Sequence, residues 1–375
     1  MSPAPEPRVL LAVTFYNGRE FARRTMESIS RLDHEGFVLD VLVLDDASPE
    51  PGFSEHLAEL AREVGAIYYR SPRNLGIPRN VNLGLATAQS LGYDYVVISN
   101  SDVIYSENSV RLLLDALRSY PQAASATAWS TNVEPYSLPC GAELYLETQP
   151  VADLIGAALE QRFGPEIIDI PAGISFAMMV PVAVLPAVGL MDPVFGRGYG
   201  EESDWSARAS NAGFRHLLVK GSYVFHAGRG STLAAGLVSR TDIADWTNQH
   251  IVEHRSPMFR WDVDGFLRSG VLDDVKPEAV SAIIRRAAAH NGYVLLDGSR
   301  DWEDIDPSLV QVVIRSQTDE MCTAHWSGFT TEIDTDTGRT VAAVSAYFAG
   351  EAPVYTNIPA ATWEGAAQFG YPAGL

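Results

Sequence analysis

Predicted strands and helices alternate over the first hundred residues, and this order constrains the fold more than any other feature. Apolar runs rich in β-branched residues predict the strands, and apolar residues spaced three or four apart predict helices between them. The predicted strands are Val9–Thr14, Leu39–Leu44, Ala66–Arg70 and Tyr93–Ser99; the predicted helices are Glu20–Leu32, Phe53–Val64 and Asn80–Leu91. This alternation implies right-handed β-α-β units and therefore an α/β fold with a mostly parallel sheet flanked by helices.

Polar turns follow three of these strands at the point where each strand ends. They are Thr14–Asn17, Asp45–Ser48 and Asn100–Asp102. One such turn alone is typical of a side-chain cap on the next helix. Three of them at the carboxyl ends of neighbouring parallel strands indicate a ligand site, because open α/β sheets bind their ligands at that edge.

The alternation weakens after about residue 120. Further strands are predicted at Ala123–Thr131, Ile174–Val180 and His216–Phe225, and helices at Val151–Phe163 and Ser203–Ala212. The stretch Ile174–Met191 has no charged residue and approaches the length of a membrane span. Because Pro181, Pro186 and Gly189 interrupt it, we interpret it as a buried strand followed by a short helix that Pro181 opens.

The sequence changes character near residue 240, which predicts a domain of residues 1–240 and a C-terminal α+β domain of residues 241–375. Helices are predicted in the second domain at Thr241–Glu253 and Pro277–His290. Strands are predicted at Val310–Arg315 and Val341–Phe348, with a hairpin turn at Phe329–Gly338. We expect this domain to bind the acceptor or to form an oligomer contact.

Charge and cysteine content exclude several classes of protein. The formal net charge is −20, which argues against a surface that binds nucleic acid by charge. Cys140 and Cys322 lie far apart, so neither a disulfide scaffold nor a structural zinc site is expected. The sequence has no GxGxxG after the first strand and no GxxxxGK[ST], so a phosphorylated ligand would need a metal ion here. We expect a cytoplasmic protein without a transmembrane segment, with peripheral association at the inner membrane face as the second option.

Seven motifs in order resemble a family 2 glycosyltransferase of the GT-A fold, of a rhamnosyltransferase-like subgroup. They are Ala12–Asn17, Val43–Ser48, Asn74–Gly84, Asn100–Asp102, Gly173–Asp192, Gly198–Trp205 and His226–Ser231. Asn100 stands where the family has the first Asp of its D-x-D motif, and Met179 stands where it has an Arg. The resemblance covers about residues 8 to 235.

The resemblance implies roles for individual residues. Glu202 aligns with the catalytic base of the family, and Asp204 is the second candidate for that role. Both lie at an acidic helix start, and acidic residues there can also simply complement the helix dipole. Asp102 and His226 would hold Mn²⁺ or Mg²⁺. The implied nucleotide-sugar ligands are Thr14, Tyr16, Asp46, Arg79, Asn100 and Ser101. Glu201 and Trp205 would contact the acceptor, although core packing is the slightly favoured role of Trp205.

The sequence therefore predicts a metal-dependent inverting glycosyltransferase of the hexosyltransferase type. Its donor would be a UDP- or dTDP-linked sugar and its acceptor a hydroxyl on a glycan, a lipid-linked sugar or a small metabolite. The alternative is a catalytically degenerate module that binds a nucleotide-sugar or glycan without turnover. A nucleotidyltransferase is the third reading, and it would need a glycine-rich, basic segment directly after the first strand, where Phe15–Arg19 stands instead.

Overall fold

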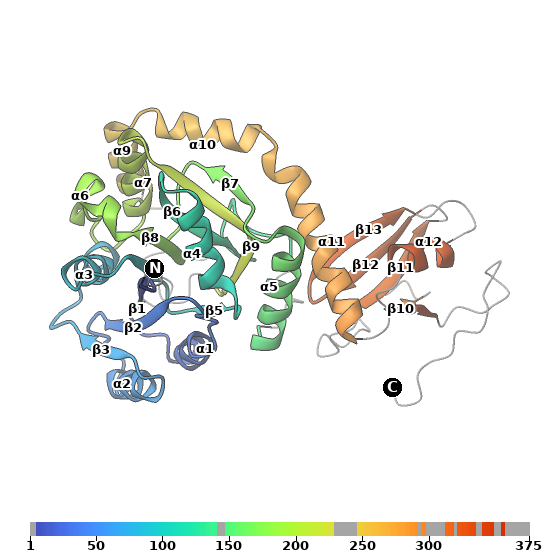
Figure 1. Ribbon diagram of the computed structural model, residues 1–375, viewed down its shortest axis with the longest axis horizontal. Helices are drawn as coiled ribbons and strands as arrows, with labels where there is room; N and C mark the ends of the chain where they lie inside the picture. The colour runs from blue at the N-terminus through green and yellow to red at the C-terminus, as the bar shows by residue number, and fades with distance from the viewer. Residues whose placement is uncertain are drawn as a thin grey trace. The chain divides into compact units, whose positions relative to one another are not determined.

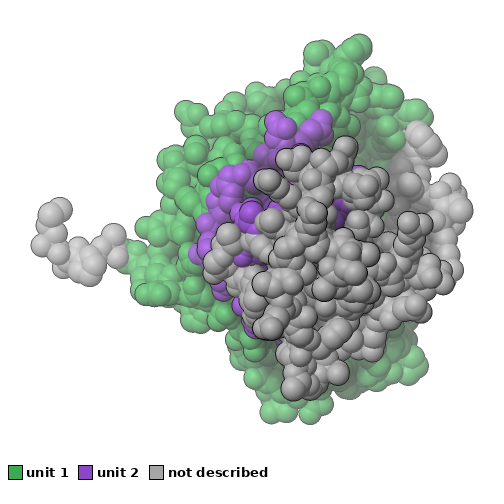
Figure 2. Space-filling model, turned by 90° about the vertical axis from the view of Figure 1, so that its right-hand side faces the viewer, with its two compact units in different colours: residues 1–137, 163–271 green, residues 138–162, 272–375 purple. Residues whose placement is uncertain are grey.

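The computed structural model describes residues 5–140, 147–228, 246–291, 294–297, 312–318, 321–334, 340–348 and 354–356. The chain divides into two compact units, one of residues 1–137 and 163–271 and the other of residues 138–162 and 272–375 (Figure 2). This division differs from the predicted boundary near residue 240. Residues 246–271 join the first unit because helix α9 (Trp246–Arg255) is hydrogen-bonded to its loops, and residues 138–162 join the second.

The first unit is built on a sheet whose described strands follow the order β3-β2-β1-β4-β8-β6-β9-β5, with β7 paired to β9 (Figure 1). The strands β3, β2, β1, β4, β6 and β9 run in one direction, and β8, β7 and β5 run against their neighbours. The strand bounds are β1 (Arg8–Phe15), β2 (Val38–Asp45), β3 (Ile67–Arg70), β4 (Tyr95–Ser99), β5 (Val103–Tyr105), β6 (Ala123–Trp129), β7 (Ile167–Ile170), β8 (Ala177–Pro181) and β9 (Arg215–His226).

Helices cover both faces of this sheet (Figure 1). Their bounds are α1 (Arg19–Ile29), α2 (Phe53–Glu63), α3 (Ile77–Ser90), α4 (Ser109–Ser119), α6 (Leu185–Val188), α7 (Glu201–Asn211), α9 and α10 (Phe259–Arg268). As predicted, the apolar stretch around Pro181 is a buried strand, β8, followed by a short helical segment. The predicted α/β class with a mostly parallel central sheet is confirmed.

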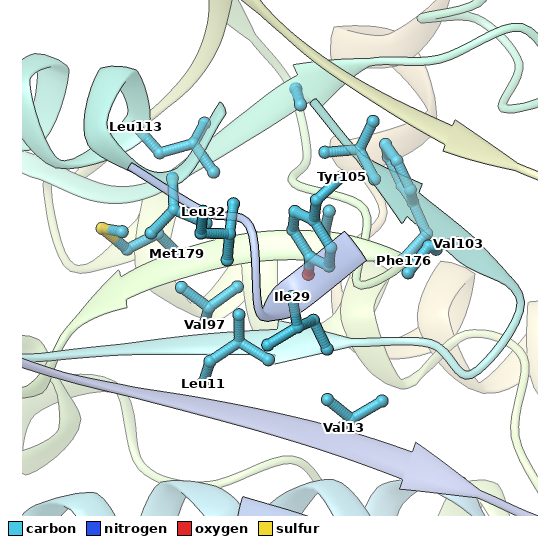
Figure 3. Packing of buried hydrophobic residues seen from close by; sticks show 14 of the residues in the cluster. Leu11, Val13, Ile29, Leu32, Val97, Val103, Tyr105, Leu113, Phe176 and Met179 are labelled. Atoms are coloured by element: carbon cyan, nitrogen blue, oxygen red, sulfur yellow. The ribbon is translucent and has the colours of Figure 1, made fainter. Parts of the chain in front are cut away.

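Alternate residues of each central strand enter two separate cores. In β1, Leu11 and Val13 face a core shared with α1, α2 and α4, and Leu10 and Ala12 face a core shared with α3 and α7. Figure 3 shows the first of these cores, in which Ile29 of α1 lies among Leu11, Val13 and Val97. A period of two along the strand places successive side chains on opposite faces, so both faces are buried and the strand sequence is almost wholly apolar.

The second unit combines a mixed sheet with three described helices. Its described strands follow the order β13-β12-β11-β10-β14, and β10, β11 and β14 are parallel to one another. The bounds are β10 (Val294–Asp297), β11 (Val312–Thr318), β12 (Met321–Trp326), β13 (Phe329–Asp334), β14 (Val354–Thr356), α5 (Gln149–Phe163), α11 (Val271–Asn291) and α12 (Thr340–Tyr347). Arg162 of α5 pairs with Glu278 of α11, which links the earlier segment to the later one.

Two predictions for the second unit were wrong. The segment Val341–Phe348 was predicted as a strand but lies mainly in helix α12, because its closely spaced alanines favour a helix and an unbroken apolar run does not distinguish the two periods. A hairpin turn lies at Ser327–Gly328, and the described part of the predicted turn, residues 329–334, is strand β13; residues 335–338 lie outside the described residues. Ser327 (φ 44°) and Gly328 (φ 84°) both have the left-handed backbone that a two-residue hairpin turn requires.

No helix in the described part of the chain is long and apolar enough to cross a lipid bilayer.

Candidate active site

The three polar strand ends predicted from the sequence do meet at one edge of the sheet. β1 lies between β2 and β4 with parallel pairing, in which Phe15 is opposite Asp45 and Val13 is opposite Ser99. The Thr14 hydroxyl donates to the Ser99 carbonyl across this edge at 3.3 Å. The predicted polar turns therefore lie at one edge of the sheet, although Asp45 also accepts a local hydrogen bond from the Ser48 N–H.

The two aspartates that end β2 both accept hydrogen bonds from the surrounding loops. Asp45 accepts from the hydroxyls of Ser54 at 2.5 Å and Tyr68 at 2.9 Å. Asp46 accepts from the backbone N–H groups of Leu75 at 2.7 Å and Gly76 at 3.0 Å. Burial raises the pKa of Asp46, and these two N–H groups oppose that shift. Asp46 therefore fixes the loop that opens α3.

Asn100, Asp102 and His226 converge after β4 and at the end of β9. The His226 Nε2 atom lies 3.1 Å from Asn100 Nδ2 and 3.3 Å from Asp102 Oδ1. Its Nδ1 atom lies 3.4 Å from the Asn132 carbonyl oxygen. In the neutral tautomer with its proton on Nδ1, the imidazole donates to that carbonyl and Nε2 can accept from Asn100; in the protonated form, Nε2–H donates to Asp102. Burial would lower the pKa of His226, but the charge and hydrogen bond of Asp102 outweigh it, so the pKa is raised.

A pair of glutamates begins helix α7. Glu202 accepts two hydrogen bonds from Ser175, from its backbone N–H at 2.7 Å and from its hydroxyl at 2.5 Å. Glu201 is 4% exposed, and its Oε2 atom has no hydrogen-bond partner among the described residues. The adjacent carboxyl groups therefore differ in their surroundings, since Glu202 has two strong donors on one oxygen.

Burial raises the pKa of both carboxyl groups. The pKa of Glu201 rises to about 8 through burial and then through the charge of Glu202. Burial also raises the pKa of Glu202, against the two Ser175 donors and the charge of His226. Two neighbouring carboxyls in unlike surroundings ionise in sequence, so one holds a proton while the other is charged. The donors on Glu202 favour it as the charged member of the pair.

These groups line one cavity of about 820 Å³. Asn100, Asp102, Glu201, Glu202 and His226 all contribute to its wall, which brings together five of the residues predicted from the sequence. The wall also includes residues of α9 and α10, and none of the site residues predicted from the sequence lies in these two helices. These are Gln249, Val252, Glu253, Phe259, Arg260, Val263 and Asp264.

Other predicted residues lie outside the wall of this cavity. Thr14 and Tyr16 are half-buried at the end of β1, and Arg79 is exposed on α3. Ser101 is 4% exposed, and its carbonyl accepts a hydrogen bond from the Thr25 hydroxyl. Trp205 is 1% exposed and its indole N–H donates to the Gly189 carbonyl at 2.9 Å. Trp205 thus packs in the core, which is the alternative that the sequence slightly favoured.

Asp204 is directed to two arginines and not to the cavity. It is 2% exposed, and it accepts hydrogen bonds from Arg208 Nε at 2.9 Å and from Arg255 at 3.2 Å. Asp204 is held by two guanidinium groups and is not part of the cavity wall, whereas Glu202 is. The structure therefore favours Glu202 over Asp204 as the candidate base.

Replacing Asp204 with asparagine is expected to lower the free energy of unfolding by about 2 kcal/mol, since it removes the charge that two guanidinium groups share. Urea unfolding would measure this loss, and nucleotide binding should remain. If Asp204→Asn instead kept its stability and lost all transfer activity, Asp204 and not Glu202 would be the base.

Sequence reasoning missed Ser175 and the whole contribution of α9. Ser175 is the polar residue at the start of an otherwise apolar run, and that contrast is a signal that could have found it. Asn248 of α9 lies in a segment with no motif, and its Nδ2 atom is within 3.1 Å of three carbonyl oxygens. Nothing in the local sequence predicts those contacts.

The donor set at the strand ends fits a divalent metal. Asp102, in the turn between β4 and β5, supplies a carboxylate oxygen, and His226, at the end of β9, supplies an imidazole nitrogen. The Asn132 carbonyl fixes the orientation of the imidazole. No group of three or more His, Cys, Asp or Glu able to hold a metal occurs among the described residues. A metal held by these two side chains would need its remaining ligands from a bound molecule and from water.

Comparison with family models gives a match in the first part of the chain. Residues 11–139 match the model of glycosyl transferase family 2. The match covers strands β1 to β6, and it confirms the family 2 resemblance for this segment; the rhamnosyltransferase-like subgroup stays a prediction. A search of curated proteins gave no match to the chain.

Two solved structures are similar to the chain at low sequence identity. One is GalNAc-T7 with UDP, GalNAc and Mn²⁺, at 15% identity and a TM-score of 0.46, with 59% of this chain and 44% of that one covered. This chain thus spans less than half of that protein. The other is the mannosyltransferase PcManGT from Pyrobaculum calidifontis in complex with GDP-Man and Mn²⁺, at 15% identity and a TM-score of 0.44, with 76% of each chain covered.

Proposed function

We propose that the chain is a metal-dependent, inverting glycosyltransferase that transfers a sugar from a nucleotide-sugar to an acceptor hydroxyl. The observation that carries the proposal is that a candidate base, Glu202, and a candidate metal pair, Asp102 and His226, line one cavity in a fold whose first part matches family 2. The donor is expected to be UDP- or dTDP-linked, and the acceptor a glycan, a lipid-linked sugar or a small metabolite.

Asp102 and His226 are the residues that would hold Mn²⁺ or Mg²⁺. When bound, such an ion supplies positive charge that neutralises the leaving diphosphate. Asn100 has an uncharged amide, so Asp102 is the one carboxylate that this pair of positions offers to a metal ion. The phosphates of the donor would have to supply further ligands. The ion and the nucleotide-sugar should therefore bind together.

Glu202 would take the proton of the acceptor hydroxyl as that oxygen attacks the sugar. Inversion requires a base on the face of the sugar opposite the leaving group. Ser175 holds one oxygen of Glu202 with two hydrogen bonds, which fixes the carboxylate and leaves the other oxygen to accept. Glu201, which holds its proton to about pH 8 because burial raises its pKa, would meet the acceptor as a neutral acid.

Calorimetric titration with UDP, dTDP and GDP tests the proposal. Each nucleotide is titrated with Mn²⁺ and with EDTA, into the wild type, Asp102→Ala and the control Asp115→Ala on the exposed side of α4. One nucleotide is expected to bind with Mn²⁺ only, and Asp102→Ala should weaken that binding by at least about tenfold, as the loss of an ion's protein ligand does.

The other results have definite meanings. Binding that ignores both Mn²⁺ and Asp102 would contradict the metal assignment. Metal-dependent binding without transfer of sugar to any acceptor would favour the alternative, a degenerate module that binds a nucleotide-sugar. Equal weakening by Asp115→Ala would show that the effect is not specific to the site.

A further inference from the structure

Helix α9 presents one face to the segment that delivers the two glutamates. Asn248, Val252 and Arg255 are spaced by four and three residues, so they lie on one side of the helix. All three reach the segment 192–204, which contains the turn 195–200 and the start of α7. A β-carbon on Gly200 would lie 3.4 Å from Val252 Cγ2, so the Val252 side chain reaches the backbone at the start of α7. This helix lies outside the part of the chain that matches family 2.

Asn248 is the central contact on that face. It is 7% exposed, and its Nδ2 atom lies 3.1 Å from the Phe195 carbonyl oxygen, 2.8 Å from that of Gly198 and 2.9 Å from that of Tyr199. One amide group with two N–H bonds thus serves three carbonyls of one turn. Buried carbonyls without such a donor would cost free energy, so the amide stabilises this conformation of the turn.

The turn needs this support because its backbone is unusual. Tyr199 has a φ of 69°, in the left-handed region that residues other than glycine rarely adopt. On the side of α3 the turn is tightly enclosed: a β-carbon on Gly76 would lie 2.2 Å from the Gly196 carbonyl oxygen, and one on Gly198 would lie 2.7 Å from Ile77. The turn is therefore held between the start of α3 and helix α9, immediately before Glu201 and Glu202.

Arg255 holds the same segment at both of its ends. Its guanidinium lies 2.8 Å from Asp192, before the turn, and 3.2 Å from Asp204, in the first turn of α7. Asp204 also accepts from Arg208, which is on α7 itself. One side chain of α9 thus ties the entrance of the loop to the helix that carries the glutamates.

A neighbouring side of α9 lines the cavity. Gln249, Val252 and Glu253 belong to its wall, together with Ser256, which follows the helix, and Phe259 of α10. The helix that fixes the glutamate turn is therefore also part of the surface that a bound acceptor would meet. A single rigid element can set the distance between the acceptor and the base, and such placement to within an ångström is worth large factors in rate.

We propose that Asn248 is a positioning residue for Glu202 and acts through the turn 195–200. Helix α9 thereby fixes the position of the candidate base relative to the part of the cavity wall that α9 itself forms. This inference rests on the proposed function and adds a specific residue to it. Asn248 touches neither substrate nor metal in this role. Its removal should reduce the rate of the transfer step and leave the binding of the donor largely as it is.

The test uses the full chain with Asn248→Asp, which keeps the shape and removes the donor, and Asn248→Ala, which removes the side chain. Both are expected to lower kcat by about 10–100-fold with a change in donor KM of less than about threefold, as a small displacement of a catalytic group does. Amide hydrogen exchange in peptides covering 195–202 should become at least about tenfold faster, because the turn opens locally. His254→Ala, an exposed residue of the same helix, is the matched control and should resemble the wild type.

The exchange measurement keeps this inference separate from the proposed function. Faster exchange confined to 195–202 supports the positioning role even if the wild type transfers no sugar, a result that would count against the proposed function alone. Unchanged exchange in both variants, or a kcat equal to that of the wild type, would overturn the inference. If Asn248→Asp does not fold, Asn248→Ala gives the same comparison.

Discussion

Replacing Glu202 with glutamine is expected to slow sugar transfer by about 10²–10⁴-fold, the range that proton transfer by a positioned side chain contributes. Glutamine has nearly the same shape, and its amide oxygen can still accept the two hydrogen bonds that Ser175 donates. What it lacks is a basic oxygen for the proton of the acceptor. The rate constant kcat, measured with the donor that titration identifies, should fall while the affinity for that nucleotide stays within about twofold, since the nucleotide does not depend on the base.

Ser175→Ala is the companion to this variant. It removes the hydroxyl donor but keeps the backbone N–H at position 175, so we expect a smaller loss of about tenfold, the worth of one hydrogen bond to a charged group. A Glu202→Gln chain with a kcat within threefold of the wild type would show that another group takes the proton.

The second large effect concerns stability, and it comes from Glu201. Burial raises the pKa of Glu201 to about 8, whereas the unfolded chain has the ordinary value of 4.5. Between these two values the folded state holds a proton that the unfolded state has lost, so rising pH favours unfolding, by at most about 1.4 kcal/mol per pH unit. Glutamine cannot ionise, so Glu201→Gln removes this dependence.

Urea unfolding at pH 5, 6.5 and 8 would show the difference. The stability of Glu201→Gln relative to the wild type should increase with pH, by about 1 kcal/mol per unit across this window. Glu55→Gln, at an exposed position of α2, provides the control and should give a difference that does not vary with pH. A constant difference for Glu201→Gln as well would mean that the folded protein ionises Glu201 as readily as the unfolded chain does.

The alternation of strands and helices in the first hundred residues, and the sheet edge at which the polar turns meet, could be predicted from the sequence because both follow from local patterns. Apolar runs such as Val9–Thr14 have a clear period, and parallel strands must bring their carboxyl ends to one edge. The acidic start of α7 and the histidine at the end of β9 were found through motifs. Their meeting in one cavity required the antiparallel strand β8 and the long strand β9, whose pairing depends on contacts far apart in the chain.

The contribution of α9 and α10 to the site could not be predicted, for a physical reason. Asn248 acts through hydrogen bonds to backbone carbonyls, and any turn of suitable shape presents such groups whatever its side chains are. Helix α10 has apolar residues at helical spacing, such as Phe259, Val263 and Phe266, but none of its residues is buried in the structure. Its sequence pattern therefore does not reveal that it lines the cavity instead of a core. The hydrogen-bond partner of a polar side chain such as Asn248 can be identified only from the three-dimensional structure.

The division of the chain into units has a practical consequence for dissecting the protein. Because residues 138–162 belong to the second unit, the chain crosses between the units three times, after residues 137, 162 and 271. A chain shortened at residue 271 would keep α5 but lose α11, and with it the Glu278 partner of Arg162. No single cut therefore isolates the first unit; this would take both removal of residues 272–375 and an internal deletion that rejoins Ser137 to Phe163.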